Sequence, residues 1–320
     1  MKDEKRATID GAVSYTLSDK LSNKILFTEL AAIYISNSRL KHQSIKKYNS
    51  LKHDFERYEM ENNTRVYIND INSSFLEKIG KWMSTSQDNF NPTINRKFKT
   101  INAMMNYAVD ENMISSKGYK RMKPLDEIKE NDKSLTEDEL NILKSQPRNQ
   151  WLDIFLFSCE TGLRVSDLKE LSVNNIKMLD RYKVLDFYTE KVKKAQIVPL
   201  SNYACTIIEG RDGKVFTKIS GQKLNQYLKS IFKLAGLDRK IEQKQIKWVT
   251  QVTTVNHLWE IAHIHMGRHT YATRLAEGGL PLTFLQDNLG HSAITTSMKY
   301  THVADINRTN ATLEILNRSK

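Results

Sequence analysis

The chain has 320 residues, 39% of them hydrophobic and 27% charged, which favours about two folded domains and excludes an intrinsically disordered chain. Lys and Arg number 49 against 37 Asp and Glu, and the net charge of +12 favours a polyanionic partner such as nucleic acid, although a merely basic protein has the same balance. Two cysteines outside any CxxC pair argue against a disulfide framework or a thiolate zinc site. No segment resembles an export signal or approaches the roughly 18 apolar residues of a membrane span, so we expect a cytoplasmic protein with no membrane partner.

The first half of the chain has a helical pattern of apolar residues. Residues 1–22 are polar, and we expect a flexible N-terminus there, whereas the pattern over 23–116 predicts a bundle of about four helices. One helix is expected over 92–109, with Asn91 as its N-cap and Pro92 at its first position. The polar face of this helix is our candidate for contact with DNA phosphates, and an ordinary solvated face is the alternative. Its basic residues are Arg96, Lys97 and Lys99.

A second domain is predicted to follow a charged, proline-containing linker at residues 117–133. This domain would span residues 134–320 and begin with a capping box in the segment TEDE. Most of it has a helical pattern, but residues 182–200 contain two β-like runs joined by a basic turn. Residues 236–264 show no clear pattern. The predicted fold class is therefore mainly α (α+β), with a small antiparallel sheet in a mostly helical second domain.

Three segments of the second domain carry polar residues that could act on a phosphate. TGLRVSDLKEL places Arg164 and Asp167 one helical turn apart, where such a pair is usually an ordinary surface ion pair. TEKVKKAQIVPL places Lys191 beside a hairpin turn, where lysines are usually just solvated. HMGRHTYATRLAEGG places His265 and Arg268 on one helix face, and this pair suits a phosphate better than a metal, because a guanidinium stays protonated.

A fourth segment, LGHSAITTSMKYTHV, follows a helix whose leucines are expected to face a core. Gly290 is the expected C-terminal cap of that helix, His291 comes next, and Tyr300 follows nine residues later. A lone tyrosine is far more often a packing residue than a nucleophile. The four segments therefore become informative only through their joint order.

That order resembles the catalytic domain of the tyrosine recombinases, the phage integrase family. TGLR, HxxRHTxAT, LGHS and a Tyr nine residues after that His are characteristic of the family, and the resemblance covers residues 134–318. The helical half resembles the family's core-binding, SAM-like domain in character and position. The motifs are also similar to those of integrases from Bacteroides-type mobile elements. The short segment before residue 23 favours the simpler recombinases, which lack an arm-binding domain.

The resemblance implies a site-specific recombinase that cuts and rejoins DNA strands through a 3′-phosphotyrosine, for integration or excision of a mobile element or phage. Tyr300 would be the nucleophile, Arg164 and Arg268 would bind the phosphate oxygens, and Lys191 would protonate the leaving 5′ oxygen. No metal and no cofactor are implied. The full implied catalytic set is Arg164, Lys191, His265, Arg268, His291 and Tyr300.

The supporting residues and the partners also follow from the resemblance. Asp167 and Gly290 would support the site, and Lys193 and Lys194 would contact DNA. The implied partners are a specific double-stranded DNA site and a homotetramer that joins two sites, with accessory DNA-bending proteins as a further class. The helix expected at 303–317 would dock on a neighbouring subunit or, alternatively, on its own core.

Two other functions remain open from the sequence. A type IB topoisomerase-like enzyme would use the same chemistry on a single duplex, without joining two sites. A DNA-binding architectural protein with a silent active site would share the basic charge, but the complete set of catalytic residues argues against it. The target sequence and the physiological reaction (integration, excision, inversion or resolution) do not follow from the residues.

Overall fold

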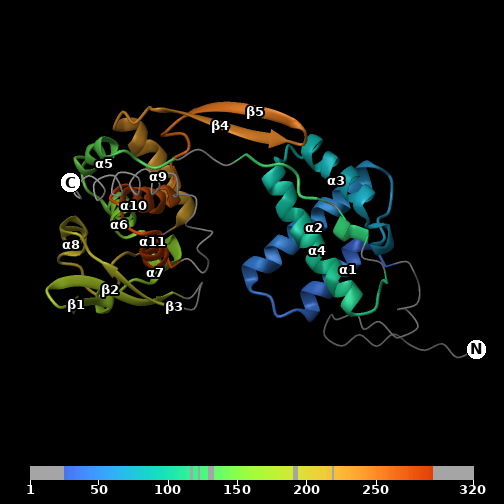
Figure 1. Cartoon of the computed structure of the whole chain (residues 1–320), viewed down its shortest axis with the longest axis horizontal. Helices are drawn as coiled ribbons and strands as arrows, with labels where there is room; N and C mark the ends of the chain where they lie inside the picture. Colours follow the sequence, from blue (N-terminus) through green and yellow to red (C-terminus); the bar gives the residue numbers. More distant parts are fainter. Residues whose placement is uncertain are drawn as a thin grey trace, which may run out of the picture. The chain divides into compact units, whose positions relative to one another are not determined.

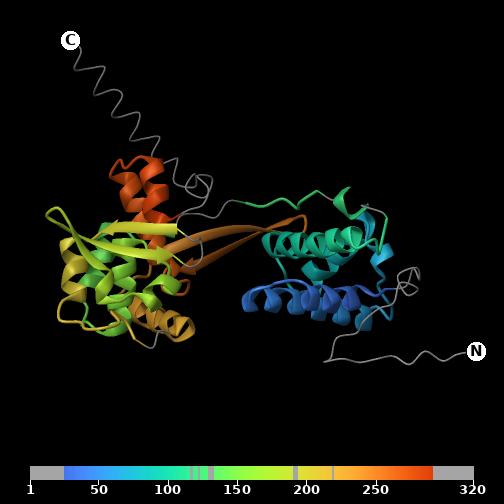
Figure 2. The same cartoon turned by 90° about the horizontal axis from the view of Figure 1, so that it is seen from below.

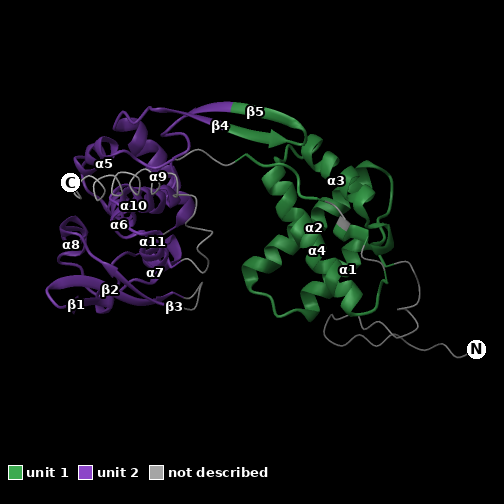
Figure 3. Cartoon of the chain, viewed as in Figure 1, with its two compact units in different colours: residues 1–130, 244–253 green, residues 131–243, 254–320 purple. Residues whose placement is uncertain are grey.

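The computed structural model divides the chain into two compact units. The first consists of Met1–Glu130 and Lys244–Thr253, and the second of Asn131–Gln243 and Thr254–Lys320 (Figure 3). Within the residues described, no helix combines the length and the apolar character that a membrane crossing requires. The structure describes residues 25–115, 118–121, 123–128, 133–189, 194–217 and 220–290.

The first unit is a helical bundle, as the apolar pattern predicts. α1 contacts both α2 and α4 (Figures 1 and 2), and the ring of Phe27 stacks on that of Phe55 with 3.8 Å between centroids. The apolar stripe expected on α4, which includes Ile94, Ile101 and Met105, is buried in this core. The elements are α1 (Phe27–Asn37), α2 (His42–Glu61), η2 (Ile68–Asp70), α3 (Ser73–Thr85), α4 (Asn91–Asp110) and η3 (Gly118–Arg121).

Asn91 is not the N-cap of α4, contrary to the prediction. The cap position is Phe90, and Asn91 is the first helical residue, fully buried. Its side-chain oxygen accepts from the backbone N–H of Trp248 at 2.7 Å, and its amide nitrogen donates to the Trp248 carbonyl at 2.8 Å. The side chain is therefore used to bind a distant segment, residues 244–253, into the first unit. Asn95, one turn later, makes the same pair of bonds to the backbone of Leu125, at 2.8 and 2.9 Å.

Residues 244–253 form the tip of a two-stranded sheet, β4 (Lys240–Lys247) and β5 (Thr250–His257). The ring of Trp248 lies so close to α3 that a Cβ on Gly80 would come within 2.9 Å of it. This sheet was not predicted, because both strands contain few buried residues and lack the alternation of apolar and polar residues that marks a half-buried strand.

The second unit is built around α6, which is buried along nearly its whole length and packs against α10. A Cβ on Gly267 of α10 would lie 3.0 Å from the Ser158 side chain of α6, so the two helices approach closely. The capping box predicted at the start of α5 is confirmed at Thr136 and Glu139. The helices are α5 (Glu137–Lys144), α6 (Gln150–Thr161), α7 (Val165–Glu170), η4 (Val173–Asn175), α8 (Asn202–Ile208), α9 (Gly221–Leu234), α10 (His265–Glu277) and α11 (Leu282–Leu289).

A three-stranded antiparallel sheet completes the second unit, in the order β1 (Ile176–Leu179), β2 (Tyr182–Thr189), β3 (Lys194–Pro199). β2 and β3 are the predicted strand pair, and β1 is an additional strand. In the register, Leu185 lies opposite Val198 in the core, which places Gln196, two residues earlier on β3, on the same inward face. The mainly α fold with small antiparallel sheets agrees with the predicted class.

Candidate active site

The turn that presents Arg164 is set by Gly162. This glycine ends α6 in the left-handed conformation, with φ of 66°, and a Cβ there would lie 2.4 Å from the Tyr271 ring. Only glycine therefore satisfies both the backbone and the space at this position. Two residues later, Arg164 stands at the N-cap position of α7 in an extended conformation.

Arg268, on α10, is the buried cation of the site, with only 7% of its surface exposed. Its Nη1 donates to the Gly162 carbonyl at 2.8 Å, and its Nη2 donates to the Leu289 carbonyl at 2.5 Å. Arg268 thus ties together the ends of α6 and α11, two helices that are far apart in the sequence. A buried guanidinium must be paired to be tolerated, and here backbone carbonyls supply that pairing.

The C-terminal end of α11 gathers three side chains. Gly290 ends this helix in the left-handed conformation, with φ of 57°, which confirms it as the predicted cap. Gln196 donates to the carbonyls of Asp287 and Asn288, Arg268 to that of Leu289, and Arg164 Nη2 to that of Gly290 at 3.2 Å. A helix C-terminus carries unsatisfied carbonyls and partial negative charge, so it attracts both arginines to one point.

Arg164 retains hydrogen-bonding capacity at this point. Its Nη1 is buried and has no hydrogen-bond partner among the described residues, and the same holds for Oδ2 of Asp167. An unsatisfied buried guanidinium donor is costly, and a phosphate oxygen is a group that it binds well. The arrangement therefore has the chemistry of an anion site made of two guanidinium groups, one of which still has a donor available.

His265 and Arg268 are brought onto one helix but into different surroundings. His265 is the first residue of α10 and is exposed, whereas Arg268 is buried one turn later. The His265 ring lies 5.7 Å from that of His269, in an edge-on arrangement. The pair therefore offers one imidazole near the surface and one guanidinium in the interior.

Tyr271 is the tyrosine of α10 beside these groups, and it is buried. Burial raises its pKa to about 12, although the charge of Arg268 acts in the opposite direction. Tyr271 therefore stays protonated near neutral pH, and its ring packs against the Gly162 turn. These properties suit a packing residue and not a nucleophile.

The three basic residues predicted on α4 differ in how accessible their charges are. Lys97 lies 2.9 Å from Asp54 and donates to Gln87 at 2.8 Å, with 19% of its side chain exposed. Arg96 is exposed, but its guanidinium bonds back to the first turn of its own helix. Lys99 is exposed. Lys97 is thus occupied inside the bundle, whereas Arg96 and Lys99 are both exposed.

Several predicted site residues lie outside the described part of the chain. They are Lys191, Lys193, His291, Tyr300 and the side chain of Lys194, together with the helix expected at 303–317. The sequence interpretation also missed one residue, Gln196. The available signal was its place on the inward face of β3, two residues before the buried Val198.

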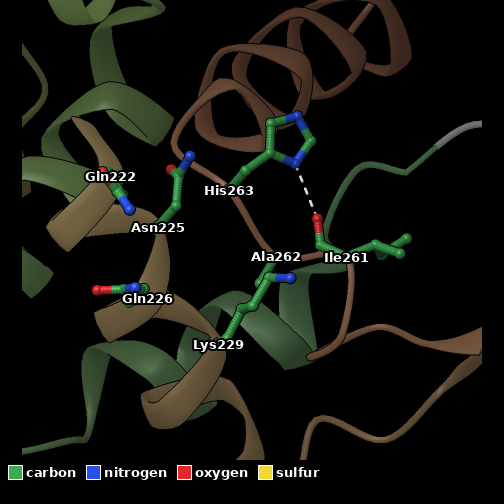
Figure 4. A pocket seen from close by; sticks show the side chains of 7 residues that line it. All are labelled: Gln222, Asn225, Gln226, Lys229, Ile261, Ala262 and His263. Atoms are coloured by element: carbon green, nitrogen blue, oxygen red, sulfur yellow. Dashed lines mark hydrogen bonds between the residues drawn. The ribbon is translucent and has the colours of Figure 1, made fainter.

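A pocket of about 350 Å³ lies between α9 and the segment that leads into α10 (Figure 4). Asn225 accepts a hydrogen bond from the backbone N–H of Ile264 at 3.0 Å, which braces the start of α10. Nδ1 of His263 lies 2.8 Å from the Ile261 carbonyl, so that nitrogen carries the proton.

No cluster of three His, Cys, Asp or Glu side chains suited to a metal occurs within the described ranges. The pocket between α9 and the segment before α10 is lined by Gln222, Asn225, Gln226, Lys229, Ile261, Ala262 and His263.

Fold and site together define a basic, mainly helical protein in which two arginines meet at the end of one helix. The model of the phage integrase family matches residues 133–306, and that of the phage integrase SAM-like domain matches residues 26–126. The chain therefore belongs to the phage integrase family, the tyrosine-type site-specific DNA recombinases.

Curated relatives agree with this assignment. A tyrosine recombinase of Thermosipho africanus is 26% identical over 241 residues, which cover 72% of this chain and 78% of that protein. A tyrosine recombinase of Pseudothermotoga lettingae is 27% identical over 266 residues, which cover 78% of this chain and 85% of that protein.

Solved structures share the fold at low identity. The Tn1549 transposon integrase, in complex with a circular intermediate DNA, has a TM-score of 0.66 and 17% identity, with 87% of this chain and 95% of that chain covered. The XerH site-specific recombinase, in a post-cleavage complex with palindromic difH DNA, has a TM-score of 0.62 and 16% identity, with 89% and 83% covered. At this identity, the likeness concerns the fold alone.

Proposed function

We propose that the chain cuts and rejoins DNA by attack of Tyr300 on a backbone phosphate. The Tyr300 oxygen forms a bond to phosphorus, the bond from phosphorus to the 5′ oxygen breaks, and Lys191 gives the leaving oxygen its proton. The tyrosine proton leaves to His265 or to solvent. The product is a 3′-phosphotyrosine, and attack by a 5′ hydroxyl reverses the steps without ATP or metal.

The observation that carries this proposal is the meeting of Arg164 and Arg268 at the end of α11. Phosphoryl transfer places extra negative charge on the non-bridging oxygens, and fixed guanidinium donors stabilise it. The Nη1 of Arg164, buried without a hydrogen-bond partner among the described residues, is a suitable donor to such an oxygen. His291, next in sequence to Gly290, would add a further donor, and Asp167 would support Arg164.

The proposed substrate is a specific double-stranded DNA site. The proposed reaction is integration or excision of a mobile element, and the fold shared with the Tn1549 transposon integrase supports it. The proposed assembly is a homotetramer on two synapsed sites, in the cytoplasm at the nucleoid, with accessory DNA-bending proteins as further partners. The helix expected at 303–317 would dock on a neighbouring subunit. Lys99, Lys193 and Lys194 are proposed phosphate contacts, together with Arg96, whereas Lys97, which is paired with Asp54, is not.

The test is trapping of the covalent intermediate on a nicked duplex that carries the attachment site, because the nicked fragment diffuses away and prevents rejoining. We expect an SDS-resistant protein–DNA adduct from the native chain and none from Tyr300→Phe. Tyr182→Phe, the same change at an exposed position on β2, is the control and should form the adduct normally. An adduct from Tyr300→Phe would refute the assignment of the nucleophile, and loss of cleavage in EDTA that magnesium restores would refute the metal-free mechanism.

A further inference from the structure

We infer that Gln196 is a positioning residue that holds the phosphate-binding arginines in place through the end of α11. The inference rests on the proposed function of Arg164 and Arg268, and it adds a residue that does not itself touch the phosphate. Gln196 lies on β3, and Lys191 belongs to the residues that connect β2 to β3 in the sequence.

The side chain of Gln196 is buried, with 6% of its surface exposed, and it contacts α11. Its Nε2 donates to the carbonyl of Asp287 at 3.2 Å and also to that of Asn288. Its Oε1 lies against Gly290, where an added Cβ would come within 2.9 Å. Gln196 therefore fills the space beside the last turn of the helix and satisfies two of its terminal carbonyls.

An apolar residue would be the ordinary choice at this position of β3. Val198 on the same face is fully buried in the core, and an amide in such surroundings is costly unless it is paired. The pairing here is specific, because only a donor can bind carbonyl oxygens. A carboxylate of the same shape would place negative charge against the negative end of a helix.

Consecutive backbone carbonyls at the end of α11 connect Gln196 to both arginines. Gln196 binds those of Asp287 and Asn288, and the next two along the chain orient Arg268 and Arg164. A shift of this turn would therefore move both guanidinium groups away from the phosphate. Because a displacement of about 1 Å can cost a factor of about 100 in rate, Gln196 should affect the chemical step more than DNA affinity.

The experiment compares Gln196→Glu and Gln196→Met in the full-length chain, using the nicked duplex at saturating protein. Gln146→Glu is the matched control, because the Gln146 amide also donates to a helix carbonyl, that of Ile142 at 3.2 Å, at an exposed site of the same unit. The readouts are the single-turnover rate of adduct formation, the dissociation constant for DNA, the melting temperature, and the ratio of each rate to the native rate between pH 5.5 and 8.5.

We expect Gln196→Glu to slow adduct formation by about 10- to 100-fold at pH 8 while DNA affinity changes by less than about threefold. Burial beside carbonyl oxygens raises the pKa of the introduced carboxyl, and its protonated form is again a donor. The relative rate of this variant should therefore recover as the pH falls. Gln196→Met has no donor at any pH, so its relative rate should stay low and constant.

A merely structural role would lower the melting temperature and DNA affinity together and would show no acid recovery, and that result would overturn the inference. Rates within about twofold of native for both Gln196 variants would also overturn it, as would an equal loss in Gln146→Glu. These outcomes leave the proposed function intact as long as the native chain forms the adduct and Tyr300→Phe does not. Absence of an adduct from the native chain would instead refute the proposed function and the inference with it.

Discussion

Arg268 and Gly162 are 106 residues apart in the sequence, and Nη1 of Arg268 donates to the Gly162 carbonyl at 2.8 Å. This bond joins α10 to the turn that leads into Arg164, so one cation of the site fixes the backbone that presents the other. The two arginines therefore form one structural unit, and changes in the turn should be felt at both.

Gly162→Ala should destabilise the second unit more than an ordinary glycine replacement. The change would strain a backbone with φ of 66° and drive a Cβ to within 2.4 Å of the Tyr271 ring. The strain alone costs about 1–2 kcal/mol, and overpacking adds about 1–3 kcal/mol. Unfolding in urea, followed by circular dichroism, measures the loss.

The control for this prediction is Gly213→Ala. Gly213 has nearly the same φ, 62°, but no atom would lie within 4 Å of its Cβ. It should therefore show the backbone strain without the clash. Equal losses of unfolding free energy in the two variants would mean that the Tyr271 ring yields and that the close approach has no energetic role.

The stability of the second unit should decline in alkali partly through Tyr271. Its pKa is raised from 10.0 to about 12, chiefly by burial, so the folded state holds the phenol proton more tightly than the unfolded state does. This contribution is complete below pH 10 and is lost as the pH rises from about 10 to 12. A shift of about two pKa units corresponds to roughly 2–3 kcal/mol.

Tyr271→Phe removes this contribution. Because the pKa values of Tyr34, Tyr119 and Tyr203 are also raised, the informative quantity is the difference in unfolding free energy between the native chain and the variant, measured at pH 9 and pH 11.5. We expect the native chain to lose more stability than the variant over this interval. Parallel curves would show that Tyr271 ionises alike in the folded and unfolded chain.

Lys97 and Lys99 should respond differently to neutralisation. Lys99 is exposed, and its replacement by Gln should reduce the slope of log affinity against log salt by about 0.9 if it contacts one phosphate. Lys97 is paired with Asp54, so Lys97→Gln should lower the melting temperature of the first unit and leave the salt slope nearly unchanged. Fluorescence anisotropy with labelled DNA, at roughly 50–300 mM salt, measures the two salt slopes. Thermal unfolding of each variant measures the melting temperature.

The reverse result would assign different DNA-contacting residues to α4. A salt slope that changes with Lys97→Gln and not with Lys99→Gln would mean that the Lys97 pair with Asp54 opens when DNA binds. Unchanged slopes for both variants would show that this face of α4 is an ordinary solvated surface, the alternative that the charge pattern left open.

Most helices and the strand pair β2–β3 could be predicted from the sequence, because their signals are local. Apolar spacing marks the buried face of α4, a capping box marks the start of α5, and Gly290 marks the end of α11. The exposed hairpin β4–β5 had no such signal, and the side chain of Asn91, predicted to cap α4, instead binds Trp248, 157 residues away.

By itself, the sequence determined the family and the order of the candidate catalytic residues, since short motifs preserve residue types and spacing along the chain. Only the tertiary structure decided which groups meet. Gln196 and Asn288 are 92 residues apart, and nothing in the local pattern says that an amide on one strand will satisfy the end of a distant helix. The gathering of Gln196, Arg268 and Arg164 on four consecutive carbonyls arises because buried polar groups must find partners wherever the packed chain supplies them.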